Sequence, residues 1–412
     1  MTTTSGPSVV GPSAPGLRKV AIAHARLGWG GSEVYVMWGI DALVKAGYEV
    51  TLLTLGDVEL TELNAWCGTS LRNGDFHVRR PGYVPALTPL LRAAAVRDSL
   101  FQRFCRSVAG EFDVLISGYN PCDFGQPAVH LVQDFSWHQG LRDEFDAPPA
   151  DGSWRIHRKG PLRAAYLGLA GLLAAPSGRN LLAGRDLFVA NSRWVADLAR
   201  ERCGFCNQRV VYPPVVFRSE PLPDAGRDDG FVILGRVGAE KRIEQAIEII
   251  GRLRGMGHAV RLHIVGDLAA GTPYGDKIGT LVGARSTWVI AEGRQVGVEK
   301  EWTLMRHRYA IHARPGEAFG IGVAELVKAG CIPFVPALGG PAEIVGAPEL
   351  CWSGIDDAVR AIDRVLQDPV RQTRLRRHLA ERAALFGIDR FQREFLRAIE
   401  HFAAQSTPLE LG

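Results

Sequence analysis

The sequence lacks an apolar run that approaches the roughly 18 residues of a membrane-spanning helix, so we expect no transmembrane segment. It also lacks a strong charge, because 48 basic and 44 acidic residues leave a net charge of only +4, which gives no argument for a nucleic-acid partner. The seven cysteines are odd in number and scattered, which fits a reducing cytosol better than a disulfide framework. We therefore expect a cytoplasmic protein.

One pair of cysteines, Cys203 and Cys206, has the C-x-x-C spacing of metal and redox sites. No second pair and no histidine partner lies nearby, so we favour two small residues at the end of a helix and predict no metal site. Residues 1–17 begin MTTTSGPSVVGPSAPG, without a basic region followed by an apolar core. They are expected to form a disordered tail rather than a signal peptide.

At 412 residues the chain is long for one hydrophobic core and suits two domains of about 150–200 residues each. Its first half begins with a buried-strand pattern at 19–25, a glycine-rich loop, a helical pattern at 34–43 and a second strand pattern at 49–55. Such a unit starts a parallel sheet that is covered by helices. Further strands are predicted at 112–117, 128–133 and 186–191.

The polar, proline-bearing segment 217–229 has the composition of an interdomain linker. After it the alternation restarts, with a strand at 230–236, an amphipathic helix at 240–257 and more strands. We therefore predict the fold class α/β, with two tandem Rossmann-like, doubly wound domains at 18–216 and 230–387 facing a cleft. In such sheets a ligand binds beyond the carboxyl ends of the strands, which places it in the cleft.

Two segments point to a ligand with phosphate groups. Gly28-Trp29-Gly30-Gly31 lies between a strand end and a helix start, where glycines let the backbone approach a ligand and free amides favour an anion. Arg236 follows the strand after the linker, and Lys241 opens the next helix. Cations at a helix start oppose the helix dipole unless an anion is bound there. The glycine spacing differs from G-x-G-x-x-G, which speaks against a nicotinamide cofactor.

A third segment, EAFGIGVAE, holds two carboxylates, Glu317 and Glu325, around the start of a helix. Free amides at Phe319, Gly320 and Ile321 can bind an anion there. Two acids would repel a pyrophosphate, so we expect them to accept hydrogen bonds from sugar hydroxyls instead. The three segments together predict a ligand that combines a diphosphate with sugar.

The motifs GRVGAEKR, VANSRWVADLA and ARPGEAFGIGVAELVKAGCIPFVPALGGPAEIV closely resemble those of the large family 4 of retaining glycosyltransferases, which have the GT-B fold. The resemblance extends from Lys19 to about Phe402. It implies a hexosyltransferase with a nucleoside-diphosphate sugar as donor and no cofactor. It also implies that 388–412 forms a helix that crosses back to the first domain, followed by a tail.

The residues that this resemblance assigns to the donor are Gly30, Gly31, Arg236, Lys241, Phe319, Gly320, Ile321 and Glu325. Among them, Glu325 would hold the ribose, and Arg236 and Lys241 the diphosphate. Glu317 would hold the transferred sugar near its 3-hydroxyl. The cations and amides would meet the charge that develops on the leaving diphosphate, so retaining transfer would need no metal. The two domains would close on the donor and exclude water.

Within the family, SGYNPCDFGQPAVHLVQDF is most similar to the bacterial relatives of the mannosyltransferase that extends the lipid-linked oligosaccharide core, which makes GDP-mannose the leading donor. Relatives usually have a histidine at the end of this strand, where the chain has Gln133, followed by Asp134. Gln133 can hydrogen-bond a hydroxyl but cannot take up a proton at neutral pH, which argues against proton transfer at this catalytic position. His130 alternates to the opposite face and is expected to pack.

The acceptor is expected on the first domain, as a glycan, a lipid-linked compound or a small molecule. Residues 151–175 join basic and aromatic residues, among them Trp154, Arg158 and Lys159, to an apolar helix at 162–175. This segment could lie on the inner membrane face near a lipid-linked acceptor. We favour a core helix with a solvated basic start.

Two other functions fit the same fold: a nucleotide-sugar-binding protein without turnover, and a nucleotide-sugar epimerase. The complete set of Arg236, Lys241, Glu317 and Glu325 argues against lost activity.

Overall fold

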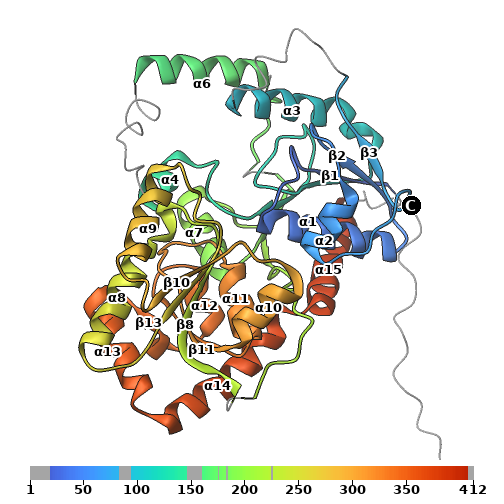
Figure 1. Cartoon of the computed structure of the whole chain (residues 1–412). Helices are drawn as coiled ribbons and strands as arrows, with labels where there is room; N and C mark the ends of the chain where they lie inside the picture. The colour runs from blue at the N-terminus through green and yellow to red at the C-terminus, as the bar shows by residue number, and fades with distance from the viewer. Residues whose placement is uncertain are drawn as a thin grey trace, which may run out of the picture.

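The computed structural model describes residues 19–82, 94–145, 160–174, 176–181, 184–223 and 226–406. It contains two parallel β-sheets, one in either lobe, each covered by helices (Figure 1). The fold is therefore α/β with two Rossmann-like domains, as predicted. The expected tail at 1–17, the basic segment with Trp154, Arg158 and Lys159, and the chain after residue 406 lie outside the described residues.

The sheet of the first lobe has seven strands in the order β3-β2-β1-β4-β5-β6-β7. The strands are β1 (Lys19–Ala23), β2 (Glu49–Leu53), β3 (His77–Arg79), β4 (Val114–Ser117), β5 (Val129–Val132), β6 (Leu187–Ala190) and β7 (Gln208–Val210). The helices are α1 (Gly31–Lys45), α2 (Leu60–Cys67), α3 (Ala94–Val108), α4 (Gln139–Phe145), α6 (Pro161–Ala174) and α7 (Arg193–Cys203). All five strands predicted for this half are present. The short edge strand β3 is largely exposed and has no apolar run that could have predicted it.

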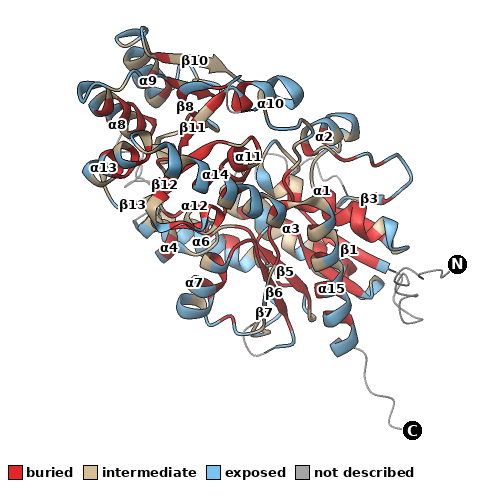
Figure 2. Cartoon of the chain, turned by 90° about the horizontal axis from the view of Figure 1, so that it is seen from below, coloured by how far each residue is buried: buried red, intermediate tan, exposed pale blue. Residues whose placement is uncertain are grey.

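The sheet of the second lobe has six strands in the order β10-β9-β8-β11-β12-β13. The strands are β8 (Asp228–Leu234), β9 (Leu262–Val265), β10 (Val289–Gly293), β11 (His307–Ile311), β12 (Ile332–Pro336) and β13 (Cys351–Trp352). The helices are α8 (Ile243–Gly255), α9 (Pro273–Gly283), α10 (Gly297–Met305), α11 (Ile321–Lys328), α12 (Gly340–Val345), α13 (Ile355–Leu366) and α14 (Pro369–Ala383). Buried residues gather on the strands and on the helix faces against them in both lobes (Figure 2).

Helix α7 shows how local chemistry sets the element bounds. The hydroxyl of Ser192 accepts a hydrogen bond from the amide of Val195 at 3.0 Å and caps the first turn. The helix ends at Cys203 because Gly204 adopts φ 73, a left-handed conformation that glycine tolerates. Cys203 thus ends a helix, as predicted, while Cys206 is exposed, and both thiols are free.

The start of α8 corrects the prediction that Lys241 opens a helix running from residue 240. Lys241 lies in a separate 3-10 turn, Ala239–Lys241, and α8 begins at Ile243. The two are divided by Arg242, whose φ of 49 is left-handed and breaks the helical path. Lys241 is therefore held on a turn in front of the helix rather than in its first turn.

Helix α6 corrects a second prediction, that the apolar segment 162–175 is a core helix. It packs beside α3 at the outer edge of the first lobe (Figure 1). Leu167, Leu169 and Leu172 are exposed, Leu172 to 78%. The apolar pattern of α6 therefore does not reflect burial in a core. None of the helices in the described ranges is long and apolar enough to cross a membrane.

The last helix, α15 (Ile388–Ser406), packs on α1 of the first lobe after the chain leaves the second lobe (Figure 1). The rings of Tyr35 and Phe391 meet edge to face with centroids 4.8 Å apart. Gly39 leaves room for Phe395, because a Cβ there would lie 3.1 Å from its ring. The chain thus connects the two lobes twice, once before β8 and once before α15.

Candidate functional site

A cavity of about 760 Å³ lies between the two lobes. It is bordered by the carboxyl ends of strands from both sheets, where parallel α/β sheets bind ligands. All ten residues that the sequence marked as site residues line this one cavity. They are Gly30, Gly31, Gln133, Arg236, Lys241, Glu317, Phe319, Gly320, Ile321 and Glu325.

Glycines allow the two walls to approach each other. A Cβ on Gly31 would lie 2.7 Å from Cδ1 of Ile321, so a side chain at Gly31 would require the Ile321 side chain at the start of α11 to move. Gly339 and Gly340 fit closely against the loop that holds Glu317, since a Cβ on Gly340 would lie 2.4 Å from a carbonyl oxygen of that loop. The amide of Gly340 donates to the carbonyl of Glu317 at 2.8 Å. These contacts explain the Gly-Gly that follows the acidic segment.

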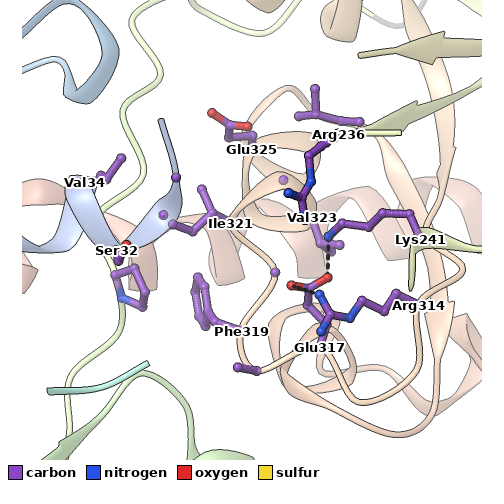
Figure 3. A pocket seen from close by; sticks show the side chains of 18 of the residues that line it. Ser32, Val34, Arg236, Lys241, Arg314, Glu317, Phe319, Ile321, Val323 and Glu325 are labelled. Atoms are coloured by element: carbon purple, nitrogen blue, oxygen red, sulfur yellow. Dashed lines mark hydrogen bonds and ion pairs between the residues drawn. The ribbon is translucent and has the colours of Figure 1, made fainter. Parts of the chain in front are cut away.

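Glu317 lies at the centre of a cluster of positive charge. Its Oε2 is 2.5 Å from Nζ of Lys241, and its Oε1 is 3.5 Å from the guanidinium of Arg314. Figure 3 shows both basic side chains directed at the carboxylate. Burial acts to raise the pKa of Glu317, but Lys241, Arg314 and the neighbouring His312 outweigh it and lower the pKa to about 2. Glu317 is therefore a carboxylate at neutral pH.

His312 lies beside Glu317, with Nε2 3.7 Å from Oε2 of the carboxylate. This ring nitrogen is buried and has no hydrogen-bond partner among the described residues. Burial, followed by the charge of Lys241, lowers the pKa of His312 to about 4. The ring is neutral at pH 7, so the site contains an uncharged histidine next to a charged acid.

Arg236 and Lys241 point to different partners, although both line the cavity. The guanidinium of Arg236 pairs with Glu240 at 2.8 Å, and the side chain of Arg236 is 81% exposed. Lys241 is 21% exposed and bound to Glu317. Arg236 therefore has more freedom to turn toward an anion than Lys241 has.

Glu325 pairs with Lys300 of α10, whose ammonium lies 2.6 Å from Oε1. Glu325 stands in the middle of α11, behind the turn at Gly320. Gly320 has φ 94, which glycine tolerates, and the helix starts immediately after it. No described residue accepts a hydrogen bond from the amides of Phe319, Gly320 or Ile321. This helix start can therefore donate to an anion.

The wall of the first lobe is polar. The side-chain amide of Gln133 donates to the carbonyl of Gly118 at 3.0 Å, which fixes the residue that occupies the position of the family histidine. Asp134 accepts hydrogen bonds from the hydroxyl of Tyr119 at 2.5 Å and from the amide of Asn120 at 2.7 Å. His130 is fully buried and pairs with Asp186 instead of lining the cavity, as expected for a packing residue.

The two lobes also touch at the rim of the cavity. The guanidinium of Arg294, which follows β10, lies 5.9 Å from the ring of Trp29 and 5.7 Å from that of Trp66, both in the first lobe. On the other side, the hydroxyl of Ser192 donates to the carbonyl of Ala318 at 2.7 Å. The cavity is thus bounded by contacts between the lobes.

Several charged or titratable residues that line the cavity were not predicted as site residues, among them Lys300, His312, Arg314 and Asp134. His312 and Arg314 follow β11 directly, and the carboxyl end of a parallel strand is a signal that could have found them. Lys300 lies within the polar stretch of α10, where nothing in the sequence distinguishes it from a surface lysine. Over the described ranges, no three histidine, cysteine or acidic side chains come together as a metal site.

Residues 219–386 match the family model described as glycosyl transferases group 1. No curated protein matches the chain. Among solved structures, sucrose-phosphate synthase from Thermosynechococcus elongatus has a TM-score of 0.69 at 16% identity, over 94% of this chain and 100% of that chain. HepE from Anabaena, solved with UDP and glucose and with UDP-glucose, has a TM-score of 0.63 at 13% identity, over 92% and 98%. The pneumococcal O-GlcNAc transferase GtfA, solved with UDP and GlcNAc, has a TM-score of 0.60 at 9% identity, over 94% and 99%.

At these identities the likeness to solved structures shows the fold alone, and that fold is the two-lobed GT-B arrangement. The region that matches the family model, residues 219–386, lies in the second lobe and contains Arg236, Lys241, Glu317 and Glu325. The group 1 domain and the fold together indicate that the protein is a glycosyltransferase.

Proposed function

We propose that the protein transfers a hexose from a nucleoside-diphosphate sugar to an acceptor hydroxyl with retention of the anomeric configuration. The observation that supports this most is the interdomain cavity, which brings Lys241, Glu317, Glu325 and the free amides at the start of α11 together. The carboxylates can accept hydrogen bonds from the sugar and ribose hydroxyls of a sugar nucleotide. The neighbouring amides and cations can bind its diphosphate.

In this proposal the diphosphate lies at the start of α11, against the amides of Phe319, Gly320 and Ile321, with Gly30 and Gly31 on the opposite wall. Lys241 and Arg236 neutralise the charge that develops as the bond to the anomeric carbon breaks, a form of preorganised stabilisation. Arg236 reaches the phosphate by leaving Glu240. A divalent metal is not needed for this step.

Glu317 holds the transferred sugar, and its low pKa keeps it an acceptor of hydrogen bonds throughout. The acceptor hydroxyl attacks from the same face as the leaving group, and a phosphate oxygen takes its proton. The side chain of Gln133 cannot take up a proton at neutral pH and already donates to the carbonyl of Gly118, so it orients a hydroxyl rather than acting as a base.

Two donors are to be tested first. GDP-mannose is the donor expected from the resemblance of the strand that ends at Gln133. UDP-glucose is the second, because the structure of HepE was solved in complex with it. Both present a base, a ribose, a diphosphate and a hexose, so the features described above do not distinguish them.

We also assign the exposed face of α6 to peripheral contact with an anionic membrane surface. Leu169 and Leu172, three residues apart and therefore on one side of the helix, present an exposed apolar face, and the sequence before the helix is rich in basic residues. An apolar helix face with adjacent positive charge binds lipid interfaces. The acceptor in this case is lipid-linked.

The proposal is tested by thermal shift with GDP, UDP and TDP, followed by the corresponding sugar nucleotides, and by NMR of the product formed with a panel of methyl glycosides and lipid-linked sugars. Stabilisation by one nucleoside diphosphate and a product with the donor's anomeric configuration are expected. Binding of the sugar nucleotide without release of nucleoside diphosphate would indicate a binding protein, and an altered sugar on an intact nucleotide would indicate an epimerase.

A further inference from the structure

Lys300 and Glu325 form an ion pair between two successive helices that are separated by β11. Lys300 comes from α10 and Glu325 from α11, and the ammonium lies 2.6 Å from Oε1. The two side chains are only 22% and 14% exposed. A pair shielded to this degree is screened less by solvent and salt than the surface pairs that contribute little.

The pair stands between two cavities. Lys300 and Glu325 line the large interdomain cavity and also a neighbouring cavity of about 100 Å³, which extends toward Val215 and Glu301. The ion pair is thus part of the partition that separates them. Glu325 is held in this partition by one oxygen, and no described residue donates to its other oxygen, Oε2.

We propose that Lys300 is a positioning residue for the donor: it fixes the carboxylate of Glu325 so that Oε2 accepts a hydrogen bond from a ribose hydroxyl. This inference rests on the proposed function, which places the ribose at Glu325. The other lysine near Glu325, Lys328, donates to the carbonyl of Val215 at 2.6 Å and is engaged there. Lys300 is therefore the cation that sets the rotamer of Glu325.

Charge compensation is the alternative to a positioning role for Lys300. Glu325 and a bound diphosphate repel each other, and an ammonium bonded to Glu325 reduces that repulsion. Position and charge can be separated with 2′-deoxynucleotides, because these keep the diphosphate but lose a hydroxyl. A residue that acts by positioning Glu325 changes the affinity for the ribonucleotide, whereas a residue that acts on the phosphates changes both affinities alike.

The experiment measures the affinities of UDP, 2′-deoxy-UDP, GDP and 2′-deoxy-GDP by calorimetry, and uses the pair whose base the wild-type protein binds. Lys300→Met keeps an unbranched side chain of similar length and removes the charge, and Lys300→Arg restores the charge. The control is Lys277→Met, which breaks a more exposed lysine–glutamate pair, 3.0 Å long, between Lys277 of α9 and Glu244 of α8, outside the cavity. Thermal unfolding of each variant shows whether it folds like the wild type.

We expect Lys300→Met to weaken ribonucleotide binding about tenfold, the loss typical of a hydrogen bond to a charged group. Deoxynucleotide binding should change less than about twofold, and Lys300→Arg should recover most of the loss. In a Glu325→Gln background, Lys300→Met should add little, since it acts through Glu325. Equal losses for both nucleotides, or no loss, would overturn the inference while leaving the proposed function intact. A wild-type protein that binds none of the four would overturn the proposed function itself.

Discussion

Nζ of Lys241 lies 2.5 Å from Oε2 of Glu317, so a turn after β8 is tied to the loop after β11 across the second lobe. Once a donor binds, the ammonium of Lys241 has to interact with both Glu317 and the diphosphate, because a diphosphate at the start of α11 competes with Glu317 for it. The carboxylate retains Arg314, 3.5 Å away, as a second partner. Lys241 can therefore serve the leaving group without leaving Glu317 as an unpaired buried charge.

The two members of the pair are expected to differ in their kinetic effects. Glu317→Ala should lower kcat by about 10²–10³ and change the affinity for the nucleoside diphosphate little, because Glu317 contacts the sugar that the diphosphate lacks. Lys241→Met should weaken binding of the nucleoside diphosphate itself. Steady-state kinetics and calorimetry on both variants check this, and a loss of nucleotide binding in Glu317→Ala would contradict the assignment.

Substitutions of Arg236 and of its ion-pair partner Glu240 should change the affinity for the nucleoside diphosphate in different ways. Arg236→Ala is expected to weaken nucleoside-diphosphate binding about tenfold, since a charged hydrogen bond to phosphate is lost. Glu240→Ala should leave affinity unchanged or raise it, because Arg236 is released from its 2.8 Å ion pair. Calorimetry at low and high salt measures both variants. If Glu240→Ala weakened binding as much as Arg236→Ala, the ion pair would have to persist in the complex.

The stability of the protein should fall as the pH decreases, because folding lowers the pKa values of both His312 and Glu317. His312 has a pKa of about 4 against an ordinary 6.5, so the unfolded chain binds its proton first and stability falls from about pH 6.5 to pH 4. Glu317 has a pKa of about 2 against 4.5, so its contribution is complete above about pH 4.5 and is lost as the pH falls toward 2. Each shift corresponds to about 3 kcal/mol of unfolding free energy.

Urea unfolding at pH 7, 5.5 and 4 checks the histidine part of this prediction. His312→Asn keeps a polar side chain of similar size without a titrating group. Its unfolding free energy should therefore decrease less between pH 6.5 and 4 than that of the wild type. A variant with the wild-type pH dependence would show that other groups cause the loss.

The sequence predicted the strands and the cavity residues well, because both depend on local signals. Apolar runs such as the one at β1 and the glycine-rich and acidic motifs at Gly30 and Glu317 stand in continuous stretches. Lys300 could not be predicted in this way, since its role arises only when α10 is packed beside α11. The same limit explains α6, where an apolar pattern shows that a surface is apolar but not what covers it.

Membrane contact by α6 is tested with vesicles. Leu172→Asp places a charge on the most exposed leucine of the apolar face, and it should reduce sedimentation with anionic vesicles severalfold, because a buried leucine side chain contributes about 1.5–3 kcal/mol and the carboxylate adds repulsion. Val370→Asp is the control, since Val370 is an equally exposed apolar residue on α14 of the other lobe. Nucleotide binding should not change in either variant. Equal sedimentation of wild type and Leu172→Asp would contradict the membrane contact.

Glu343 caps a helix across the boundary between the lobes. It lies on α12, and its Oε2 accepts from the amides of Arg193 at 2.9 Å and Trp194 at 3.3 Å, at the start of α7 in the first lobe. Its other oxygen accepts from the hydroxyl of Tyr212, whose pKa is raised to about 12 by burial and by this hydrogen bond. A carboxylate at a helix start satisfies free amides and complements the dipole.

Glu343→Ala should therefore cost about 1–2 kcal/mol of stability and also reduce the population of the closed arrangement in which both walls contact the donor. Apparent donor affinity falls by the same factor as that population, whichever nucleotide is used. Glu349→Ala is the matched control, because Glu349 pairs with Arg374 at 2.6 Å within the second lobe. Thermal unfolding and nucleotide affinity are measured for both. A Glu343→Ala variant that loses stability but keeps full donor affinity would show that the contact supports α7 alone and does not hold the lobes together.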